Sequence, residues 1–459
     1  MSLLASLSNA RSGMSATGVR AQVTSANIAN VSTPGYVRRD AVLSQRGSTG
    51  VSVSGVQRIQ DQVLLQTRRD AQTQSAGSEV TNAVLERALA AFGEPGSETG
   101  MFGTLSRFEG DLQTLRSTPE SAAAQTIAVD SLKDMTRALN TASGALQAER
   151  TQADARLGAD IDRLNELSDA VFELNAHIRK THSSGSDTAV LLDRRDTLID
   201  EMVGYLPLNI GYEDSGAVRV QTDTGLSLVG ANVNEIEFQS SARIGALDTT
   251  TNAGGRLSIP TLMGQPLAGA GGHALSEGRI AAYLDLRDTQ LPTQAAALDD
   301  FAFELASAFD ALGEPLLLDN GAAVDPLNKT GLSERLGVNP LIDPARGGEP
   351  RRLRDGIASV VPGAPGNDVN LTRLTEALVP FADTLSEIVS DSSSAVFRAE
   401  RIHTGNVARE VTLTETQQQL TAVDLDHELQ TLLSIEQAYT ANARVIQTIS
   451  DMFDTLARL

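Results

Sequence analysis

The chain has 459 residues, of which 41% are hydrophobic but only 3% aromatic, and it contains no tryptophan and no cysteine. This composition excludes disulfide scaffolds, thiolate nucleophiles and cysteine-based metal sites, and it favours cores of Leu, Val, Ile and Ala between helices. The formal net charge of −21 argues against nucleic acid as a partner, because phosphate binding needs clustered Lys and Arg.

The charge is unevenly distributed along the chain. Residues 1–60 carry six arginines and one aspartate, a net charge of +5, which leaves −26 on the rest. A basic end on an acidic body would help like subunits meet head to tail, although chance explains the asymmetry equally well. The N-terminus lacks the features of a secretory signal, and no apolar stretch approaches the ~18 residues of a membrane span. By these features alone the chain is expected to be cytoplasmic.

The first predicted elements are a helix and a β-hairpin. Apolar positions over 3–30 form a ragged helical stripe, and glycines with many Ser and Thr residues make this helix marginal in isolation. The sequence STPG at 32–35 ends it, because proline cannot continue a helix and glycine accepts a positive φ. A period of two over 41–59, with a turn at 47–50, predicts the hairpin.

Helical periodicity then dominates up to residue 206. The longest helix follows the start signal TPE at 118–120, and its apolar positions step by three and four from Leu132 to Ile178. At 1.5 Å per residue that run spans roughly 70 Å, which is typical of a coiled coil or a rod-like bundle. Shorter helices are predicted at 61–92, from about 103, and at 190–206.

The second half alternates between irregular and helical segments. Residues 207–275 alternate in hydrophobicity, are broken by Gly, Asn and Asp, and predict a small inserted β-rich domain with a Gly-rich exit. Helix returns at 276–312, whereas 313–368 is rich in Pro, Gly, Asn and Asp and is expected to be irregular. Two last helices are predicted at 369–404 and 411–458. The apolar surface of the final helix is wider than one partner helix would cover, which favours assembly.

Few side chains are candidates for chemistry. The stretch DLDHE at 424–428 is the densest group of possible metal or acid–base ligands, but acids in the first turn of a helix also favour its dipole, and we favour that interpretation. The acids and arginines at 193–196 are interpreted as a solvated or interhelical charge cluster, and DNG at 319–321 as a turn. We therefore expect no catalytic residue, no metal and no cofactor.

Segments near both ends resemble a known family. The stretch ANIANVSTPGYVRR at 26–39 resembles the N-terminal motif of bacterial flagellar rod, hook and hook-associated proteins, in which a helix is followed by N-I-A-N-x-x-T-P-G-Y and a basic residue. The stretch SIEQAYTANARVIQTISDMFDTLARL at 434–459 is similar to the ending of the same family. Matching segments at 143–175, 190–202 and 275–310 favour the hook-associated members over the shorter rod proteins.

Together, periodicity and resemblance predict a mainly α fold with a small β-rich insert. In this family the N- and C-terminal helices pair in a coiled coil that lines an inner tube, and they tend to be ordered only after assembly. The predicted domains are a terminal coiled-coil inner-tube domain at 1–45 and 412–459, a helical rod domain at 46–206, 276–315 and 366–411, an inserted outer β domain at 207–275, and an irregular linker segment at 316–365.

The resemblance also implies a function. It implies a structural adaptor, without catalysis, that joins the flagellar hook to the filament by self-assembly. The implied partners are like subunits in a ring, the hook protein on one side, a second junction protein on the other, and an export chaperone on the C-terminal helix, with no nucleic acid and no membrane insertion. The implied location is extracellular, reached by flagellar type III export without a cleaved signal peptide, and this replaces the cytoplasmic expectation.

The N-terminal motif is expected to shape the assembly site. Its residues 30–36 would end the inner-tube helix and redirect the chain outward, and Arg38 and Arg39 would face an acidic neighbour, although an ordinary interhelical loop shares that geometry. The candidate interface residues are Leu7, Asn27, Ile28, Asn30, Pro34, Gly35, Tyr36, Arg38, Leu429, Leu432, Tyr439, Ala443, Arg444, Ile446, Ile449, Phe453 and Leu456.

Two alternatives to the junction adaptor stay open. The first is a flagellar hook or distal-rod structural protein, although the long helix over 127–178 and the C-terminal ending favour the junction. The second is a secreted enzyme or adhesin whose active module is the 207–275 insert, because that segment is unlike the rest of the chain.

Overall fold

The computed structural model divides the chain into two compact units. Unit 1 comprises residues 1–73, 164–235 and 406–459, and unit 2 comprises 74–163 and 236–405. Helices α2, α4 and α10 have residues in both units. The structure describes residues 3–46, 50–93, 98–184, 186–250, 254–269 and 273–458.

Helices make up most of the described chain, which confirms the mainly α fold. The helices of the first half are α1 (Leu3–Ala29), α2 (Gln62–Ala90), α3 (Met101–Ser117), α4 (Ala122–Ser183) and α5 (Ala189–Met202). Those of the second half are α6 (Gly278–Asp285), the π-helix η2 (Leu286–Gln290), α7 (Leu291–Ala311), α8 (Leu332–Arg335), the short 3-10 helix η3 (Pro344–Arg346), α9 (Arg352–Asp355), α10 (Val369–Thr421) and α11 (Leu425–Arg458). The apolar positions predicted along α4, from Leu132 to Ile178, are buried.

The described strands form small antiparallel sheets. The predicted hairpin is confirmed as β1 (Arg39–Gln45) with β2 (Val51–Arg58), although residues 47–49 of its expected turn lie outside the described residues. The remaining strands are β3 (Leu208–Tyr212), β4 (Val218–Thr222) and β5 (Ser227–Val229) in one sheet, β6 (Ile236–Glu237), β7 (Thr261–Leu262) and β8 (Gln265–Pro266) in another, and β9 (Leu317–Asp319) paired with β10 (Leu336–Val338). The boundary between the units falls between β5 and β6, so a single domain over 207–275 stays a prediction.

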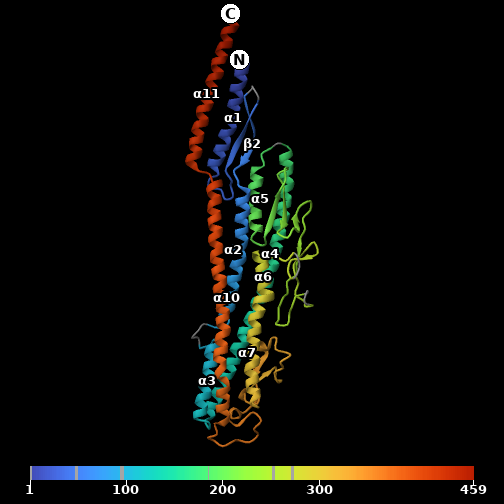
Figure 1. Cartoon of the computed structure of the whole chain (residues 1–459), viewed down its shortest axis with the longest axis vertical. Helices are drawn as coiled ribbons and strands as arrows, with labels where there is room; N and C mark the ends of the chain where they lie inside the picture. Colours follow the sequence, from blue (N-terminus) through green and yellow to red (C-terminus); the bar gives the residue numbers. More distant parts are fainter. Residues whose placement is uncertain are drawn as a thin grey trace. The chain divides into compact units, whose positions relative to one another are not determined.

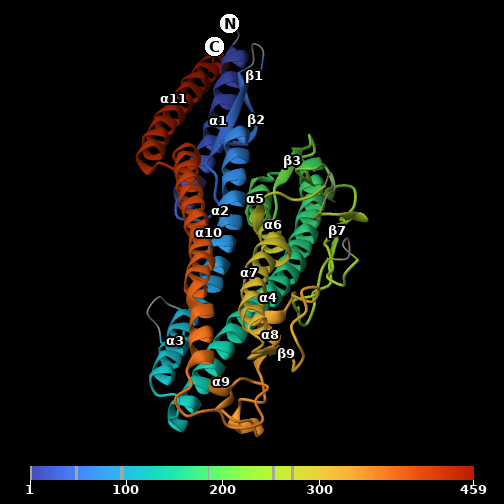
Figure 2. The ribbon, with the colours of Figure 1, turned by 60° about the horizontal axis from the view of Figure 1, so that its bottom comes forward.

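Unit 1 brings the two ends of the chain together. Figure 1 shows α1 and α11 side by side, with the N- and C-termini at the same end of the pair, and Figure 2 shows the same arrangement from another side. The β1–β2 hairpin packs against α1. The predicted pairing of the terminal helices is therefore confirmed.

The predicted break between the last two helices is wrong in its position. The break was expected at 405–410, but α10 is continuous to Thr421 and the interruption falls at 422–424. Asp424 begins the next helix: its carboxylate accepts the N–H groups of Asp426 at 2.9 Å and His427 at 3.2 Å and so caps α11. Gly405 alone does not break a helix whose neighbouring residues continue the backbone ladder.

Unit 2 is organised around a buried ion-pair network beside a π-helix. η2 carries Arg287, which is fully buried and pairs with the Asp154 carboxylate of α4 at 2.5 Å. Arg150 of α4 donates to the Arg287 carbonyl at 3.0 Å and to the Gly245 carbonyl at 3.2 Å, and Asp154 accepts the Ser241 N–H at 2.6 Å. These contacts fasten the irregular chain around 241–248 to α4, since buried charges need partners.

The described helices include none that is both long and apolar enough to cross a bilayer.

Candidate assembly interface

A hydrogen-bonded turn ends α1, as predicted. The Thr33 N–H donates to the Asn30 carbonyl at 2.9 Å, and the Tyr36 N–H donates to the Thr33 carbonyl at 3.2 Å. Gly35 has a φ of +76°, and a Cβ there would lie 2.9 Å from the Thr197 hydroxyl oxygen. Both the backbone conformation and the available space therefore require glycine at this position.

Asn27 is the polar centre of this region. Its Oδ1 accepts the Tyr36 hydroxyl at 2.8 Å and the Arg39 N–H at 3.0 Å. Its Nδ2 donates to the Arg39 carbonyl at 2.9 Å and to the Glu428 carboxylate at 3.1 Å. One buried side chain thus joins α1, the turn, β1 and α11, and both its oxygen lone pairs and its amide hydrogens are used.

The role of Glu428 could not be predicted from its place among the acids of a first helical turn. Glu428 is only 5% exposed, and its carboxylate accepts a hydrogen bond from the Asn27 amide. The signal that could have found it is its spacing of seven residues from Ile435, which is also buried.

Tyr36 anchors the turn through its hydroxyl, which donates to Asn27. Burial raises the pKa of its hydroxyl, although the positive charge of Arg39 opposes the shift. The Arg39 guanidinium lies over the Tyr36 ring, 4.8 Å from the centroid. The hydroxyl therefore remains a proton donor to Asn27 at neutral pH.

Arg38 connects the turn to the end of α10. Its N–H donates to the Thr421 carbonyl at 3.0 Å, and its carbonyl accepts the Ile59 N–H at 2.8 Å. Thr421 is the last residue of α10, so this bond satisfies one of the carbonyl groups that a helix end leaves without an intrahelical partner. The backbone of Arg38, more than its charge, links the two ends of the chain here.

The charge cluster predicted at 193–196 lies between α5 and the hairpin. Arg39 pairs with Asp193 at 2.8 Å, and Arg58 contacts Asp193 at 2.9 Å and Asp196 at 2.7 Å. Arg195 adds a second cation to Asp196 at 2.9 Å. Arg39 was expected to face an acidic neighbour, and the acids that it contacts belong to its own chain.

The pKa values of the two aspartates in this cluster are shifted in opposite directions. Burial raises the pKa of Asp193, and Arg58 and Arg39 offset only part of that effect. Burial also acts on Asp196, but there the nearby guanidinium groups of Arg195 and Arg58 outweigh it and lower the pKa.

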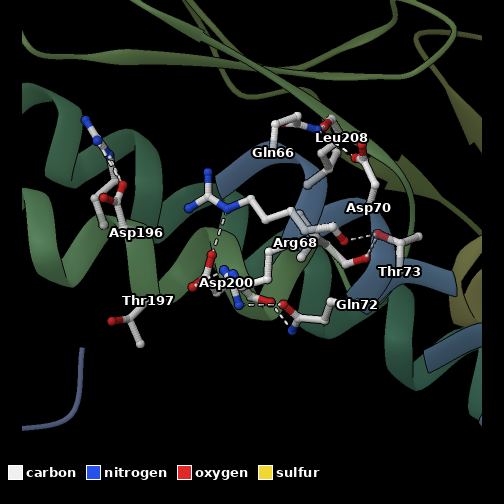
Figure 3. Close-up of polar contacts among 12 residues, drawn as sticks. Gln66, Arg68, Asp70, Gln72, Thr73, Asp196, Thr197, Asp200 and Leu208 are labelled. Carbon is white, nitrogen blue, oxygen red and sulfur yellow. Dashed lines mark hydrogen bonds and ion pairs between the residues drawn. The ribbon is translucent and has the colours of Figure 1, made fainter. Parts of the chain in front are cut away.

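A second set of polar contacts holds α2 against α5. Figure 3 shows the Asp200 side chain between the two helices, with Arg68 and Gln72 directed toward it. Asp200 pairs with Arg68 at 2.6 Å and with Arg69 at 2.7 Å, and its carbonyl accepts from the Gln72 amide at 2.7 Å. This arrangement fixes the helices on which the hairpin and its charge cluster rest.

α11 buries only one face against α1. Ile435 and Ile449 are buried: Ile435 follows Glu428 by seven residues, and Ile449 follows Ile435 by fourteen. Asn442 continues that row and faces Gly13 of α1, where a Cβ would lie 3.0 Å from the Asn442 amide nitrogen. The half-buried predicted residues of the pair are Leu7, Ile28, Leu432, Ala443, Ile446 and Phe453.

The other faces of α11 keep large apolar side chains in the open. Leu425, Leu429 and Leu433 follow each other at a spacing of four residues and are 43%, 49% and 59% exposed; we call them the leucine row. Leu433 stands 200° around the helix from Ile435, on the side away from α1. Five more of the predicted interface residues are exposed: Pro34 and Gly35 in the turn, and Tyr439, Arg444 and Leu456 on α11.

The remaining candidates for chemistry have structural roles. Asp424 caps α11, and the turn predicted at 319–321 is confirmed by the paired backbone bonds of Asp319 and Ala322, both 2.9 Å. Among the described residues, no three His, Cys, Asp or Glu side chains are grouped as a metal site requires.

Comparison with known families decides what kind of protein this arrangement belongs to. The sequence profile of the flagellar hook-associated protein FlgK helical domain matches residues 85–315, half of the chain. The chain belongs to the FlgK family. The ends match two further family profiles: flagella basal body rod protein at 7–36, and flagellar basal body rod FlgEFG protein C-terminal at 420–459.

Curated FlgK relatives match over almost their full length. Flagellar hook-associated protein 1 of Escherichia coli (strain K12) is 24% identical, over 99% of this chain and 99% of its own. Flagellar hook-associated protein 1 of Bacillus subtilis (strain 168) is also 24% identical, over 98% and 96%. A solved structure of the flagellar hook junction protein FlgK from Burkholderia pseudomallei aligns with a TM-score of 0.44 and 18% identity, over 56% of this chain and 45% of that one.

FlgK-family membership settles the broad alternatives. The family is structural and non-catalytic, which confirms the prediction that the chain is not an enzyme and overturns the alternative of an enzymatic module at 207–275. The profile that covers half of the chain is that of a hook-associated protein, as the resemblance implied. Most of the polar contacts of the turn fall inside the N-terminal match, and the leucine row falls inside the C-terminal one.

Proposed function

We propose that this chain is the structural subunit that joins the flagellar hook to the filament, and that it does so by self-assembly through its paired terminal helices. Family membership supports the flagellar role. The observation that supports assembly is the leucine row, because a folded monomer rarely leaves several large apolar side chains exposed on one helix face.

The candidate residues of the turn act within one subunit, whereas those exposed on α11 act between subunits. Asn27, Asn30, Gly35 and Tyr36 fix the angle at which the chain leaves α1, and they do so within one subunit. The exposed side chains of α11 then provide the surface on which a neighbouring subunit completes the core. Leu7, Ile28, Leu432, Ala443, Ile446, Ile449 and Phe453 hold the pair of helices on which that surface is presented.

The proposed partners follow from this role. Like subunits form a ring, the hook protein contacts it on one side, and a second junction protein leads to the filament on the other. An export chaperone covers the apolar faces of α11 before assembly. The chain functions outside the cell and reaches the hook–filament junction through the flagellar type III apparatus, without a cleaved signal peptide.

The first experiment is electron microscopy of cells that lack the gene, with flagellin assayed in the medium. We expect bare hooks and flagellin lost to the medium, and filaments should return when the full chain is supplied from a plasmid. Normal filaments on the deletion strain would rule out the junction role.

A further inference from the structure

The most exposed large apolar side chain in the described part of the chain is Leu327, at 95% exposure. It lies in unit 2, in the loop between β9 and α8. Pro326 precedes it and is exposed as well. Burying a side chain of this kind against a partner would be favourable, because it removes apolar surface from water.

The loop that carries Leu327 is held rigidly. Asp325 forms a turn with it: the Asp325 carboxylate accepts the Leu327 N–H at 2.9 Å, and the Asp325 carbonyl accepts the Asn328 N–H at 2.9 Å. Arg335 fastens the far side, donating to the Asn328 carbonyl at 2.9 Å and to the Thr330 carbonyl at 2.7 Å. Arg335 is itself fixed by two bonds of 2.9 Å to one carboxylate of β9.

Buried contacts anchor the base of the same loop. The Asp299 carboxylate of α7 accepts the Gly331 N–H at 2.6 Å and the Ser333 N–H at 2.9 Å. Lys329 pairs with Asp300 at 3.0 Å and stands over an aromatic ring of α7. The loop therefore displays Asp325 and Leu327 in one conformation, so little conformational entropy is lost when a partner binds them.

A complementary surface lies on another element of the same unit. Phe397 of α10 is 71% exposed, and an open hollow of about 700 Å³ is lined by Phe397, Arg398, Glu400, Arg401, Thr404 and Gly405. Within the described part of the chain, neither Arg398 nor Arg401 forms an ion pair. Two arginines against one glutamate leave this surface with a net positive charge, opposite to that of Asp325.

We propose that the loop tip at 325–327 of one copy of this chain docks on the α10 surface around Phe397 of a second copy. Leu327 then enters the hollow between Phe397 and Thr404, where Gly405 leaves space. Asp325 meets Arg398 and Arg401. This inference rests on the proposed function, because it specifies one contact between the like subunits of the assembly.

The placement of the two surfaces gives the contact its symmetry. Figure 2 shows β9 and α8 on the far side of α7 from α10, so the loop tip and its receptor occupy different sides of unit 2. A contact between two different patches is heterologous and generates a ring or a helical array rather than a closed dimer.

The absence of cysteine makes the contact directly testable. The full chain carrying Leu327→Cys and Thr404→Cys is expressed in the deletion strain, and isolated flagella are treated with a mild oxidant and run on a non-reducing gel. We expect covalent species longer than dimers. Copies with Leu327→Cys mixed with copies with Thr404→Cys should give dimers only, and each variant alone should stay monomeric.

A second pair of cysteines controls for cross-links that form by random collision between subunits. Val379 is also exposed on α10, but it lies 18 residues, roughly 27 Å, from Phe397 along the helix, so Leu327→Cys with Val379→Cys should not cross-link. Asp325→Arg should lower the yield of the first pair severalfold, and Arg401→Asp in the same chain should restore it.

Two results would overturn the proposed contact: monomers from the Leu327/Thr404 pair in flagella that carry filaments, or a dimer formed by Leu327→Cys with itself. Failure of the proposed function would give a different result, because the wild-type chain would then be absent from isolated flagella.

Discussion

Asn27 stabilises the meeting point of four elements because its amide both donates and accepts there. It serves the Tyr36 hydroxyl, both backbone groups of Arg39 and the Glu428 carboxylate, with distances from 2.8 to 3.1 Å. Only asparagine and glutamine side chains supply two N–H donors and a carbonyl acceptor, and the glutamine side chain is longer by one methylene group. The position is therefore sensitive to chemistry as well as to size.

Replacing Asn27 by alanine should destabilise the terminal region by about 3 kcal/mol, because it leaves a buried carboxylate, a hydroxyl and two backbone groups without their partner. Asn30→Ala is the matched control: the Asn30 amide donates to the Ala26 carbonyl at 2.8 Å in a more exposed place, and its loss should cost less than about 1 kcal/mol. Hydrogen exchange of α1 amides measures both, and equal effects would contradict the role given to Asn27.

Asp196 should make unit 1 sensitive to acid. Its pKa is lowered in the folded chain from the ordinary value of 3.8, so its charged form contributes stability above that pH and loses it as the pH falls through the lower folded value. Asp193 works in the opposite sense, since burial raises its pKa and its ionisation costs stability at neutral pH.

Asp196→Asn should therefore lower the free energy of unfolding at pH 7, and the difference from wild type should shrink progressively below pH 3.8. Denaturant titrations at pH 7 and at pH 3 provide the test, with Asp193→Asn as the companion variant. A difference for Asp196→Asn that does not change with pH would refute the ion-pair explanation.

At the scale of elements, α1 and α11 fit in a defined register. Gly13 sits opposite Asn442, close enough that any side chain would press on the amide, whereas nothing lies within 4 Å of the corresponding position at Gly18. A polar residue in the seam of two helices commonly fixes which residues face each other. The glycine and the asparagine together set how far the two helices are shifted along each other.

The two glycines give a matched test of this register. Gly18→Ala should stabilise α1 by about 0.5–1 kcal/mol, because alanine loses less backbone entropy in a helix. Gly13→Ala should give no such gain, and Gly13→Leu should release α1 from α11. Adding Asn442→Ala to Gly13→Ala should recover the gain. Hydrogen exchange of α1 is again the measurement, and identical gains at both glycines would contradict the close packing.

The positions of most helices and of the hairpin could be predicted from the sequence, whereas the side of α11 that packs against α1 could not. The helices, the hairpin and the turn at 32–35 follow from periodicity and from Pro and Gly, which act locally. The break at 422–424 was missed: the acids at 424–428 were interpreted as the first turn of a helix, but that turn was not used to end α10. The residues of α11 that face α1 could not be chosen from the sequence, because apolar side chains on several faces leave the heptad phase open. Leu429 and Tyr439, both predicted as interface residues, are exposed in the folded chain.

At the scale of the whole molecule, apolar side chains that stay exposed in a single subunit favour assembly. Leu433 of the leucine row lies on the side away from α1, and the three side chains of the row are between 43% and 59% exposed. Burial of such side chains between subunits is the main favourable term in most protein association.

Leu433→Glu should leave the folded chain intact and abolish filament attachment. The position is on the surface, so the free energy of unfolding should change by less than about 0.5 kcal/mol, while a charge would be buried in the assembly without a partner. Gln447→Glu adds the same charge at another exposed site of α11 and should leave filaments in place. Filaments on cells that carry only Leu433→Glu would show that the row is not an assembly surface.

The bond between Asn27 and Glu428 joins residues that are 401 positions apart in the chain. Contacts of such long range form late, because the entropy of closing the intervening chain must be overcome before they contribute. If the chain leaves the cell one end first through a channel, as proposed above, this region cannot be completed until nearly all of the chain is outside. On that route we expect the terminal pair of helices to form last, so that its folding would mark the end of delivery.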